Sequence, residues 1–292
     1  MKRIALATSA KLPTLNDDDR LLIPALAELE VAAVPAVWDA PDVCWEEFQG
    51  VVVRSCWDYH HRLEEFLAWV TRLEHAGVPL WNPPAVLRWN SHKGYLRDLA
   101  ARGVPIVATR WLARGRRVGL AQLLRDERWS DAVVKPAVSA SATDTWRTSA
   151  ATAGADQGRL EELLRAGDVM VQPFIAEVCD PGEWSIIFFG GRFSHAIRKR
   201  PAAGDYRVQW EFGGTAAPMA PPPRLVADAE AVMAAVPGRP LYARVDGVER
   251  DDRLMLMELE LIEPHLFLGW DADATGRLAG ALAAFINSAL SG

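Results

Sequence analysis

The sequence predicts an α/β unit over residues 1–88, followed by a longer α+β region that extends to residue 292. In the first part, short apolar runs at residues 4–8 and 51–54 alternate with helical patterns, which is typical of buried parallel strands in a layered unit. In the second part, successive strands are joined by short turns. A chain of 292 residues is long enough for two or three such subdomains with sizeable cores.

In the first part, a helix follows each predicted strand. After the strand at residues 4–8, a helix over residues 17–30 begins with three acidic residues, which favour its N-terminus. After the strand at residues 51–54, a second helix is expected over residues 62–76, where Gly77 provides a natural end. Strand, helix, strand, helix is therefore the expected order of this unit.

The second part mixes helices with paired strands and contains no internal repeat. Helical patterns cover residues 91–101, 158–166, 224–235 and 276–290. Strands are expected at residues 131–136, 169–172, 183–197 and on both sides of residues 251–253, and four prolines mark a loop near residues 216–224. The pair Gly190-Gly191 divides residues 183–197 into the two strands of a hairpin.

The composition argues against several classes of function. The net charge is -6 and the basic residues are dispersed, so the chain has no electrostatic footprint for nucleic acid. Cys44, Cys56 and Cys179 lie far apart, which argues against a disulfide framework or a zinc site. No apolar segment is long enough for a membrane span or a secretory signal. We therefore expect a cytoplasmic protein with a small-molecule substrate, either monomeric or a homodimer closed by apolar helix faces.

Two common nucleotide-binding signatures are missing. No Gly-x-Gly-x-x-Gly follows the first strand, and the chain has no Gly-x-x-x-x-Gly-Lys-Ser/Thr. A Rossmann-type dehydrogenase and a P-loop enzyme are therefore disfavoured.

The strongest local signal is an acidic cluster near the C-terminus. Glu258 and Glu260 are two residues apart in an apolar strand, so their side chains project to the same face. Two such carboxylates repel each other unless a cation lies between them, and Mg²⁺ prefers carboxylate and phosphate oxygens. Asp246 would add a third ligand if it lies across a hairpin. The alternative is a solvated strand face, although the apolar neighbours require the other face to be buried.

Two lysines are candidates for phosphate binding. Lys135 ends a strand and precedes a loop of small residues, which includes Ser139 and whose N–H groups can approach a phosphate closely. Lys93 falls in the first turn of the helix expected over residues 91–101, where the helix dipole disfavours a cation and an anionic partner is favoured. Taken singly, the loop is equally a simple turn and Lys93 a solvated side chain.

The segment after the strand at residues 51–54 is a candidate substrate site, because open α/β sheets present their ligand crevice at strand ends. Arg54 can bind a substrate carboxylate with both arms of its guanidinium, and Asp58 can hold an amino group. Trp57 and Tyr59 fit a packing role at the junction of subdomains at least as well.

In combination, these motifs follow a known order. They are, along the chain, the helix with Lys93, Gly103-Val104-Pro105, Val133-Val134-Lys135-Pro136, Val171-Gln172-Pro173-Phe174-Ile175, Glu183, Arg207, Asp246 and Glu258-x-Glu260. Over about residues 90–270, this order and spacing resemble the ATP-grasp superfamily, in which two subdomains clasp ATP.

The resemblance implies an ATP-dependent ligase that uses Mg²⁺, with Mn²⁺ as an alternative. The nucleotide-binding matches are Lys93 and Lys135 for the ATP phosphates and base, Ser139 in the phosphate loop, Gln172, Phe174 and Ile175 for the adenine, and either Glu177 or Glu183 for the nucleotide hydroxyls. The remaining matches are Arg207 near the transferred phosphate, with Lys199 and Arg198 as helpers, and Asp246, Glu258 and Glu260 as magnesium ligands.

Some residues depart from the superfamily pattern. Glu260 stands where many members have Asn, and the phosphate loop is rich in Ala and Ser where many members have Gly. Within the superfamily, residues 54–60, 81–83 and 135–140 resemble O-ureido-D-serine cyclo-ligases of antibiotic (D-cycloserine) biosynthesis, followed by prokaryotic glutathione-synthetase-type ligases. This resemblance adds Asn82 to the candidate substrate residues.

By this resemblance, residues 1–88 form a substrate domain, residues 89–172 a subdomain with the phosphate loop, and residues 173–292 a subdomain with the magnesium ligands. The implied reaction phosphorylates a small amino-acid-like carboxylate, and a nitrogen then attacks the acyl phosphate. In a cyclo-ligase this nitrogen belongs to the same molecule. The alternatives are an intermolecular carboxylate–amine ligase and a non-catalytic ATP-binding module.

Overall fold

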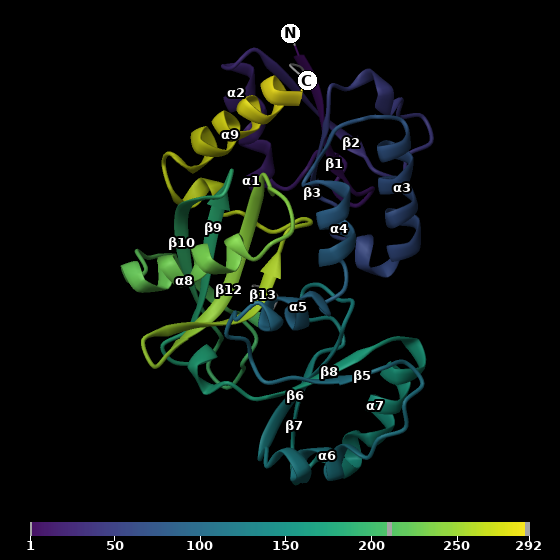
Figure 1. The fold of residues 1–292 in the computed structure, drawn as a ribbon, viewed down its shortest axis with the longest axis vertical. Helices are drawn as coiled ribbons and strands as arrows, with labels where there is room; N and C mark the ends of the chain where they lie inside the picture. Colours follow the sequence, from purple (N-terminus) through teal and green to yellow (C-terminus); the bar gives the residue numbers. More distant parts are fainter. Residues whose placement is uncertain (1, 209–211, 290–292) are drawn as a thin grey trace.

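Over residues 2–208 and 212–289, the computed structural model of the chain contains three β-sheets with helices packed on their faces (Figure 1). The N-terminal sheet is parallel, whereas the strands of the other two sheets pair antiparallel. The predicted fold class, α/β followed by α+β, is therefore confirmed.

The N-terminal sheet has the strand order β2-β1-β3-β4. Its strands are β1 (Lys2–Thr8), β2 (Val31–Val37), β3 (Val51–Ser55) and β4 (Leu80–Trp81). Helix α3 (Leu63–His75) packs on one face and helix α2 (Leu22–Ala27) packs on the other, and helix α1 (Asp17–Arg20) directly precedes α2. Because side chains alternate along β1, Ile4 and Leu6 enter one core while Ala5 and Ala7 enter the other.

The sequence analysis did not identify β2 and β4. Strand β2 is an edge strand of small residues with Pro35 in its middle, a composition that edge strands tolerate and that a strand pattern does not reveal. The helix expected over residues 17–30 is divided into α1 and α2, because Pro24 has no N–H to continue the hydrogen-bond ladder to Arg20.

The middle sheet has the strand order β5-β8-β6-β7. These strands are β5 (Arg110–Leu112), β6 (Asp131–Pro136), β7 (Trp146–Ser149) and β8 (Val169–Pro173). Helices α6 (Leu120–Glu127) and α7 (Ala153–Ala166) pack on one face around Leu124, Leu160 and Val134. This lobe projects from the rest of the molecule at the bottom of Figure 1.

The third sheet has the strand order β11-β10-β9-β12-β13. Its strands are β9 (Glu183–Phe189), β10 (Arg192–Arg200), β11 (Thr215–Pro218), β12 (Tyr242–Arg250) and β13 (Arg253–Glu260). Both predicted hairpins are present, one through Gly190-Gly191 and one through Asp251-Asp252, and all four of these turn residues have positive φ. The second hairpin places Asp246 opposite Glu258 and Arg244 opposite Glu260.

The remaining elements connect or cover these sheets. They are α4 (Pro84–Asn90), α5 (Tyr95–Ala101), α8 (Pro223–Ala234), α9 (Ala274–Ala289), and the 3-10 turns η1 (Trp45–Glu47), η2 (Tyr59–His61), η3 (Ala176–Val178) and η5 (Leu268–Trp270). Helix α9 returns to the N-terminal unit and packs beside α2 (Figure 1); position 290 of the predicted last helix lies outside the described residues. None of the helices in the described ranges has the length and apolarity to cross a membrane.

Candidate active site

A cavity of about 320 Å³ lies where the three sheets meet. Strands β6 and β8 supply one wall, strands β9, β10, β12 and β13 supply another, and Trp57 and Tyr59 close it from the N-terminal unit. Most residues predicted from the sequence line it: Lys93, Lys135, Ser139, Gln172, Phe174, Ile175, Glu183, Lys199, Arg207, Asp246, Glu258 and Glu260.

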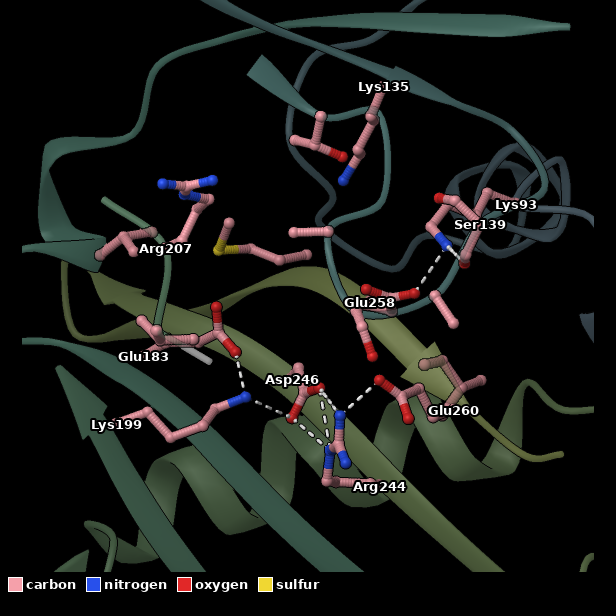
Figure 2. A pocket seen from close by; sticks show the side chains of 18 of the residues that line it. Lys93, Lys135, Ser139, Glu183, Lys199, Arg207, Arg244, Asp246, Glu258 and Glu260 are labelled. Atoms are coloured by element: carbon pink, nitrogen blue, oxygen red, sulfur yellow. Dashed lines mark hydrogen bonds and ion pairs between the residues drawn. The ribbon is translucent and has the colours of Figure 1, made fainter. Parts of the chain in front are cut away.

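Carboxylates and cations alternate on the floor of the cavity (Figure 2). Arg244 and Asp246 are two residues apart on β12, so both point to the same face, and the guanidinium contacts Asp246 at 2.9 Å. The same guanidinium also pairs with Glu260 on the neighbouring strand. Lys199, from β10, lies 2.5 Å from Glu183 and 3.6 Å from Asp246. The antiparallel register therefore brings together charges from four strands.

These contacts set the ionisation of the carboxylates. Burial alone would raise the pKa of Asp246, but Arg244 and Lys199 more than offset this and lower it. Burial is likewise outweighed at Glu258, whose pKa is lowered by Lys93 and Lys135. At Glu260, burial dominates over the attraction of Arg244, and the pKa rises to about 7. Of the three predicted magnesium ligands, Asp246 and Glu258 therefore have lowered pKa values, whereas the pKa of Glu260 lies near neutral pH.

The three predicted magnesium ligands supply only oxygen atoms, which fits the chemistry of Mg²⁺. In the described ranges, however, no group of three or more His, Cys, Asp or Glu side chains is assembled closely enough to hold a metal ion. Basic side chains take that place, since Arg244 lies between Asp246 and Glu260, and Lys93 holds Glu258 at 2.9 Å. The carboxylates must exchange these cations before they can share a metal.

The two predicted phosphate lysines differ in their partners. The Lys93 ammonium donates to the Ser139 carbonyl at 2.7 Å and pairs with Glu258, so it connects the phosphate loop to the carboxylate floor. Lys135 extends into the cavity (Figure 2) and has no ion pair or hydrogen bond of its ammonium within the described ranges. Burial accordingly lowers the pKa of Lys135. The ammonium of Lys135 is therefore open to pairing with an anionic ligand in the cavity.

An apolar slot lies beside the end of β8. Gln172 is held by a hydrogen bond from its Nε2 to Thr109 Oγ1 at 2.8 Å, and Ile175 follows it on the cavity wall. Val107 and Met257 also line the cavity and belong to the same apolar cluster as Ile175. An apolar space of this kind suits a purine base.

Comparison with known proteins decides the family. The cycloserine biosynthesis protein DcsG of Streptomyces lavendulae is 33% identical over 303 residues, which cover 96% of this chain and 97% of the relative. Residues 4–82 match the family described as D-cycloserine synthetase DcsG, N-terminal domain. The chain belongs to the D-cycloserine synthetase family of ATP-grasp ligases. It is an ATP-dependent ligase, and the predicted superfamily is confirmed.

Solved structures agree with this assignment. The crystal structure of D-cycloserine synthetase DcsG superimposes with a TM-score of 0.87 at 32% identity, covering 97% of this chain and 99% of that one. A D-alanine–D-alanine ligase from Bacillus anthracis in complex with ATP shares the fold, with a TM-score of 0.69 at 17% identity over 100% of this chain and 98% of that one. A glutathione synthetase from Prochlorococcus marinus (strain MIT 9313) is 32% identical over 149 residues, 50% of this chain and 45% of that protein. The fold is that of enzymes that use ATP with Mg²⁺.

Sequence reasoning missed Arg244. The signal was present in the sequence, because Arg244 precedes Asp246 by two residues in a strand and must share its face. The prediction considered that strand only for its carboxylate. The guanidinium provides two-pronged hydrogen bonding at the centre of the ligase cavity.

The candidate substrate residues do not reach the cavity. Arg54 is 1% exposed and forms a buried ion pair of 2.8 Å with Asp19. Asn82 is fully buried, and its amide holds the backbone of Leu241 and Leu261. Asp58 accepts a hydrogen bond from the Trp38 indole at 3.1 Å. All three side chains contact other parts of the fold and do not line the cavity, so the substrate contacts expected of them stay a prediction.

Other predictions also need correction. Lys93 lies in the turn between α4 and α5 and not in the first turn of a helix, because α5 begins at Tyr95. Arg198 points to the opposite face of its sheet from Lys199, where its guanidinium stacks on Trp184 at 4.5 Å. Glu177 pairs with Arg250 at 3.5 Å and does not line the cavity, whereas Glu183 does.

Proposed function

We propose that the ligase transfers the γ-phosphate of ATP to the carboxylate of a small amino-acid-like substrate and that a nitrogen of the same substrate then closes a ring. The observation that carries this proposal is the floor of the cavity, where Arg244 and Lys199 face several carboxylates beside the unpartnered Lys135. Such a floor combines anion-binding cations with oxygen ligands for Mg²⁺, as phosphoryl transfer between two anions requires.

The nucleotide would span the cavity from the apolar slot to the floor. The adenine would lie beside Gln172, Phe174 and Ile175, with its phosphates against Lys93 and Lys135. For the ribose hydroxyls both candidates stay open: Glu183 lines the cavity but is held by Lys199, and Glu177 lies on η3 directly after the slot without lining the cavity. The loop with Ser139 would cover the phosphates. Bound Mg²⁺, held by Asp246, Glu258 and Glu260, would neutralise charge on the transferred phosphoryl group.

In the second step, a tetrahedral oxyanion forms when nitrogen attacks the acyl phosphate carbonyl. Arg244 is placed to stabilise this charge, because its guanidinium is held rigidly by Asp246 and opens onto the cavity. Arg207, whose guanidinium stacks at 3.5 Å on Phe212, would contact the leaving phosphate. An acyl phosphate hydrolyses in water, so residues 136–168 would act as a closing lid.

Intramolecular ring closure, as in the conversion of O-ureido-D-serine to D-cycloserine in antibiotic biosynthesis, is supported by the similarity to the cycloserine biosynthesis protein along both full lengths. An intermolecular carboxylate–amine ligase is the second candidate, supported by the match to a glutathione synthetase over 50% of the chain. The two differ in whether one substrate suffices for turnover.

The test is ADP release by the purified protein with Mg-ATP and one candidate substrate at a time, O-ureido-D-serine included. We expect ADP with that compound alone, and its loss in Asp246→Asn and Glu258→Gln. Glu230→Gln, which changes an exposed acid on α8 away from the cavity and the lid, is the matched control and should keep full activity. ADP release that requires a second, amine substrate would replace the cyclo-ligase with the intermolecular ligase. Failure of every carboxylate to release ADP would contradict both.

A further inference from the structure

One carboxylate on the cavity wall differs from the others in its partners. The acidic residues that line the cavity are Glu183, Asp246, Glu258, Glu260 and Glu263. Lysine or arginine lies within 4.0 Å of each of the first four. Within the described ranges, the carboxyl group of Glu263 has no ion pair and accepts no hydrogen bond from another residue, although the residue is only 8% exposed.

The backbone around Glu263 is fixed from both sides. The Tyr242 hydroxyl donates to the Ile262 carbonyl at 2.8 Å, and the Trp57 indole donates to the Glu263 carbonyl at 3.2 Å. The next carbonyl, that of Pro264, accepts from Arg54 at 2.7 Å. Three successive carbonyls are therefore held by side chains, which orients the Glu263 side chain without neutralising it. Such preorganisation is typical of a residue that binds a ligand.

The surroundings of Glu263 suit an organic cation better than a metal ion. Trp57 and Tyr59 line the cavity here, and an aromatic face attracts a cation but supplies no metal ligand. His265 also lines this end, and because burial lowers its pKa it adds no competing positive charge near neutral pH. Mg²⁺ requires several oxygen ligands in octahedral order, and the other carboxylates are engaged on the floor.

We propose that Glu263 binds the ammonium group of the substrate, so that the ligase selects an amino acid over a simple carboxylic acid. The proposal rests on the proposed ligase function and names the part of the substrate that the floor does not bind. Glu263 follows Glu260 by three residues, which places the ammonium site next to the floor where the substrate carboxylate would be activated. An α-amino acid carries its two charged groups at this short separation.

The ionisation of Glu263 is consistent with such a ligand. Burial and the nearby charge of Glu260 raise the pKa of Glu263 to about 8 in the absence of a cation. A bound ammonium ion would provide the positive charge that no neighbouring side chain of the described residues places against the Glu263 carboxylate. This residue also replaces Asp58, the amino-group ligand expected from the sequence, whose carboxylate is engaged by Trp38.

The test is calorimetric titration in the presence of Mg²⁺ and a non-hydrolysable ATP analogue. The ligands are O-ureido-D-serine and a panel of D- and L-amino acids, each beside its counterpart without the amino group. Wild type should bind at least one amino acid about ten- to a hundredfold more tightly than its deamino counterpart, the range expected for a charged hydrogen bond. Glu263→Gln, which keeps shape and volume, should abolish this preference, and Glu230→Gln should preserve it.

The outcomes separate this proposal from the ligase function. A Glu263→Gln variant that still prefers the amino ligand, or a wild type that binds both ligands of every pair equally or binds none, overturns the ammonium site. ADP release, measured on the same protein preparations with Mg-ATP in place of the analogue, reports on the ligase reaction alone. A variant with lower kcat but an unchanged amino preference would also overturn the proposal, because Glu263 would then act on the attacking nitrogen.

Discussion

Two buried arginine–aspartate pairs in this chain have the same chemistry but different surroundings. In Arg54–Asp19, at 2.8 Å, both side chains are 1% exposed and the guanidinium also holds the Pro264 carbonyl. In Arg244–Asp246, at 2.9 Å, the side chains are 11% and 4% exposed and line the cavity. The first pair is closed off from the cavity, with Arg54 Nη1 buried and without a hydrogen-bond partner in the described ranges. Arg244, in contrast, is shared with Glu260 and faces a space that a ligand can enter. Burial of an ion pair therefore does not by itself indicate function. An ion pair indicates a functional site when one side of it faces a cavity that a ligand can enter.

The largest effect is expected from breaking the closed pair. Arg54→Met leaves the Asp19 carboxylate buried without its partner, which should lower the free energy of unfolding by about 3–5 kcal/mol. Urea denaturation measures this loss. Arg3→Met is the matched control, because its partner Glu47 is 62% exposed and the pair contributes about 0–1 kcal/mol. Equal losses in the two variants would contradict the contrast between a closed and an exposed pair.

A substitution in the Arg244–Asp246 pair should change the reaction rate and not the stability of the fold. Arg244→Lys keeps a cation near Asp246 but loses the planar fork, so we expect kcat for ADP release to fall about 10²–10³-fold with little change in unfolding free energy. Arg253→Lys, on the same hairpin, is the control, since that arginine pairs with Asp228 away from the cavity. If Arg244→Lys unfolds like Arg54→Met and keeps its kcat, the two pairs have the same role.

Lys135 extends the comparison to a buried cation that lines the cavity but has no ion-pair partner in the described ranges. In Lys135→Gln the lost ammonium–phosphate contact, about 1.5–3 kcal/mol, should raise KM for ATP about 10- to 100-fold. The midpoint of thermal unfolding should stay constant or rise, because burial disfavours the charge in the free protein. Lys11→Gln, at an exposed position, serves as the control. A large loss of stability with unchanged KM would show that Lys135 serves the fold.

Local pattern was sufficient to predict the floor of the cavity. Glu258 and Glu260 share a face because side chains alternate in a strand, and the Asp251-Asp252 turn fixes the register that brings Asp246 opposite Glu258. The same alternation would have identified Arg244. The order of the motifs over about residues 90–270 was sufficient to predict the ATP-grasp superfamily.

Tertiary contacts explain what the sequence did not reveal. All five residues of β3 are buried, so its end is covered and does not form an open crevice. The partner that neutralises Arg54 is Asp19, 35 residues earlier, on a helix whose position no local pattern fixes. Glu263 lies in the irregular segment after β13, where no periodicity indicates which side chain faces a cavity.

A third kind of buried group, neither paired nor facing a ligand, is found at His60 in η2, five residues past the end of β3, the strand that carries Arg54. Both of its ring nitrogens are buried without a partner, and burial and the neighbouring His61 lower its pKa to about 4. In the unfolded chain a histidine binds its proton near pH 6.5. The unfolded state therefore takes up a proton first, and stability is lost as the pH falls from about 6.5 toward 4. Because the ring is only partly enclosed, we expect the free energy of unfolding to fall by on the order of 1 kcal/mol between about pH 7 and 5.

Urea denaturation of His60→Gln at these two pH values tests this expectation. The difference in unfolding free energy between the two pH values should be smaller than in wild type by that amount. His75→Gln, at an exposed position, should behave like wild type. An unchanged pH dependence in His60→Gln would mean that the ring finds a proton acceptor on protonation, and that a buried polar group without a partner costs this fold nothing.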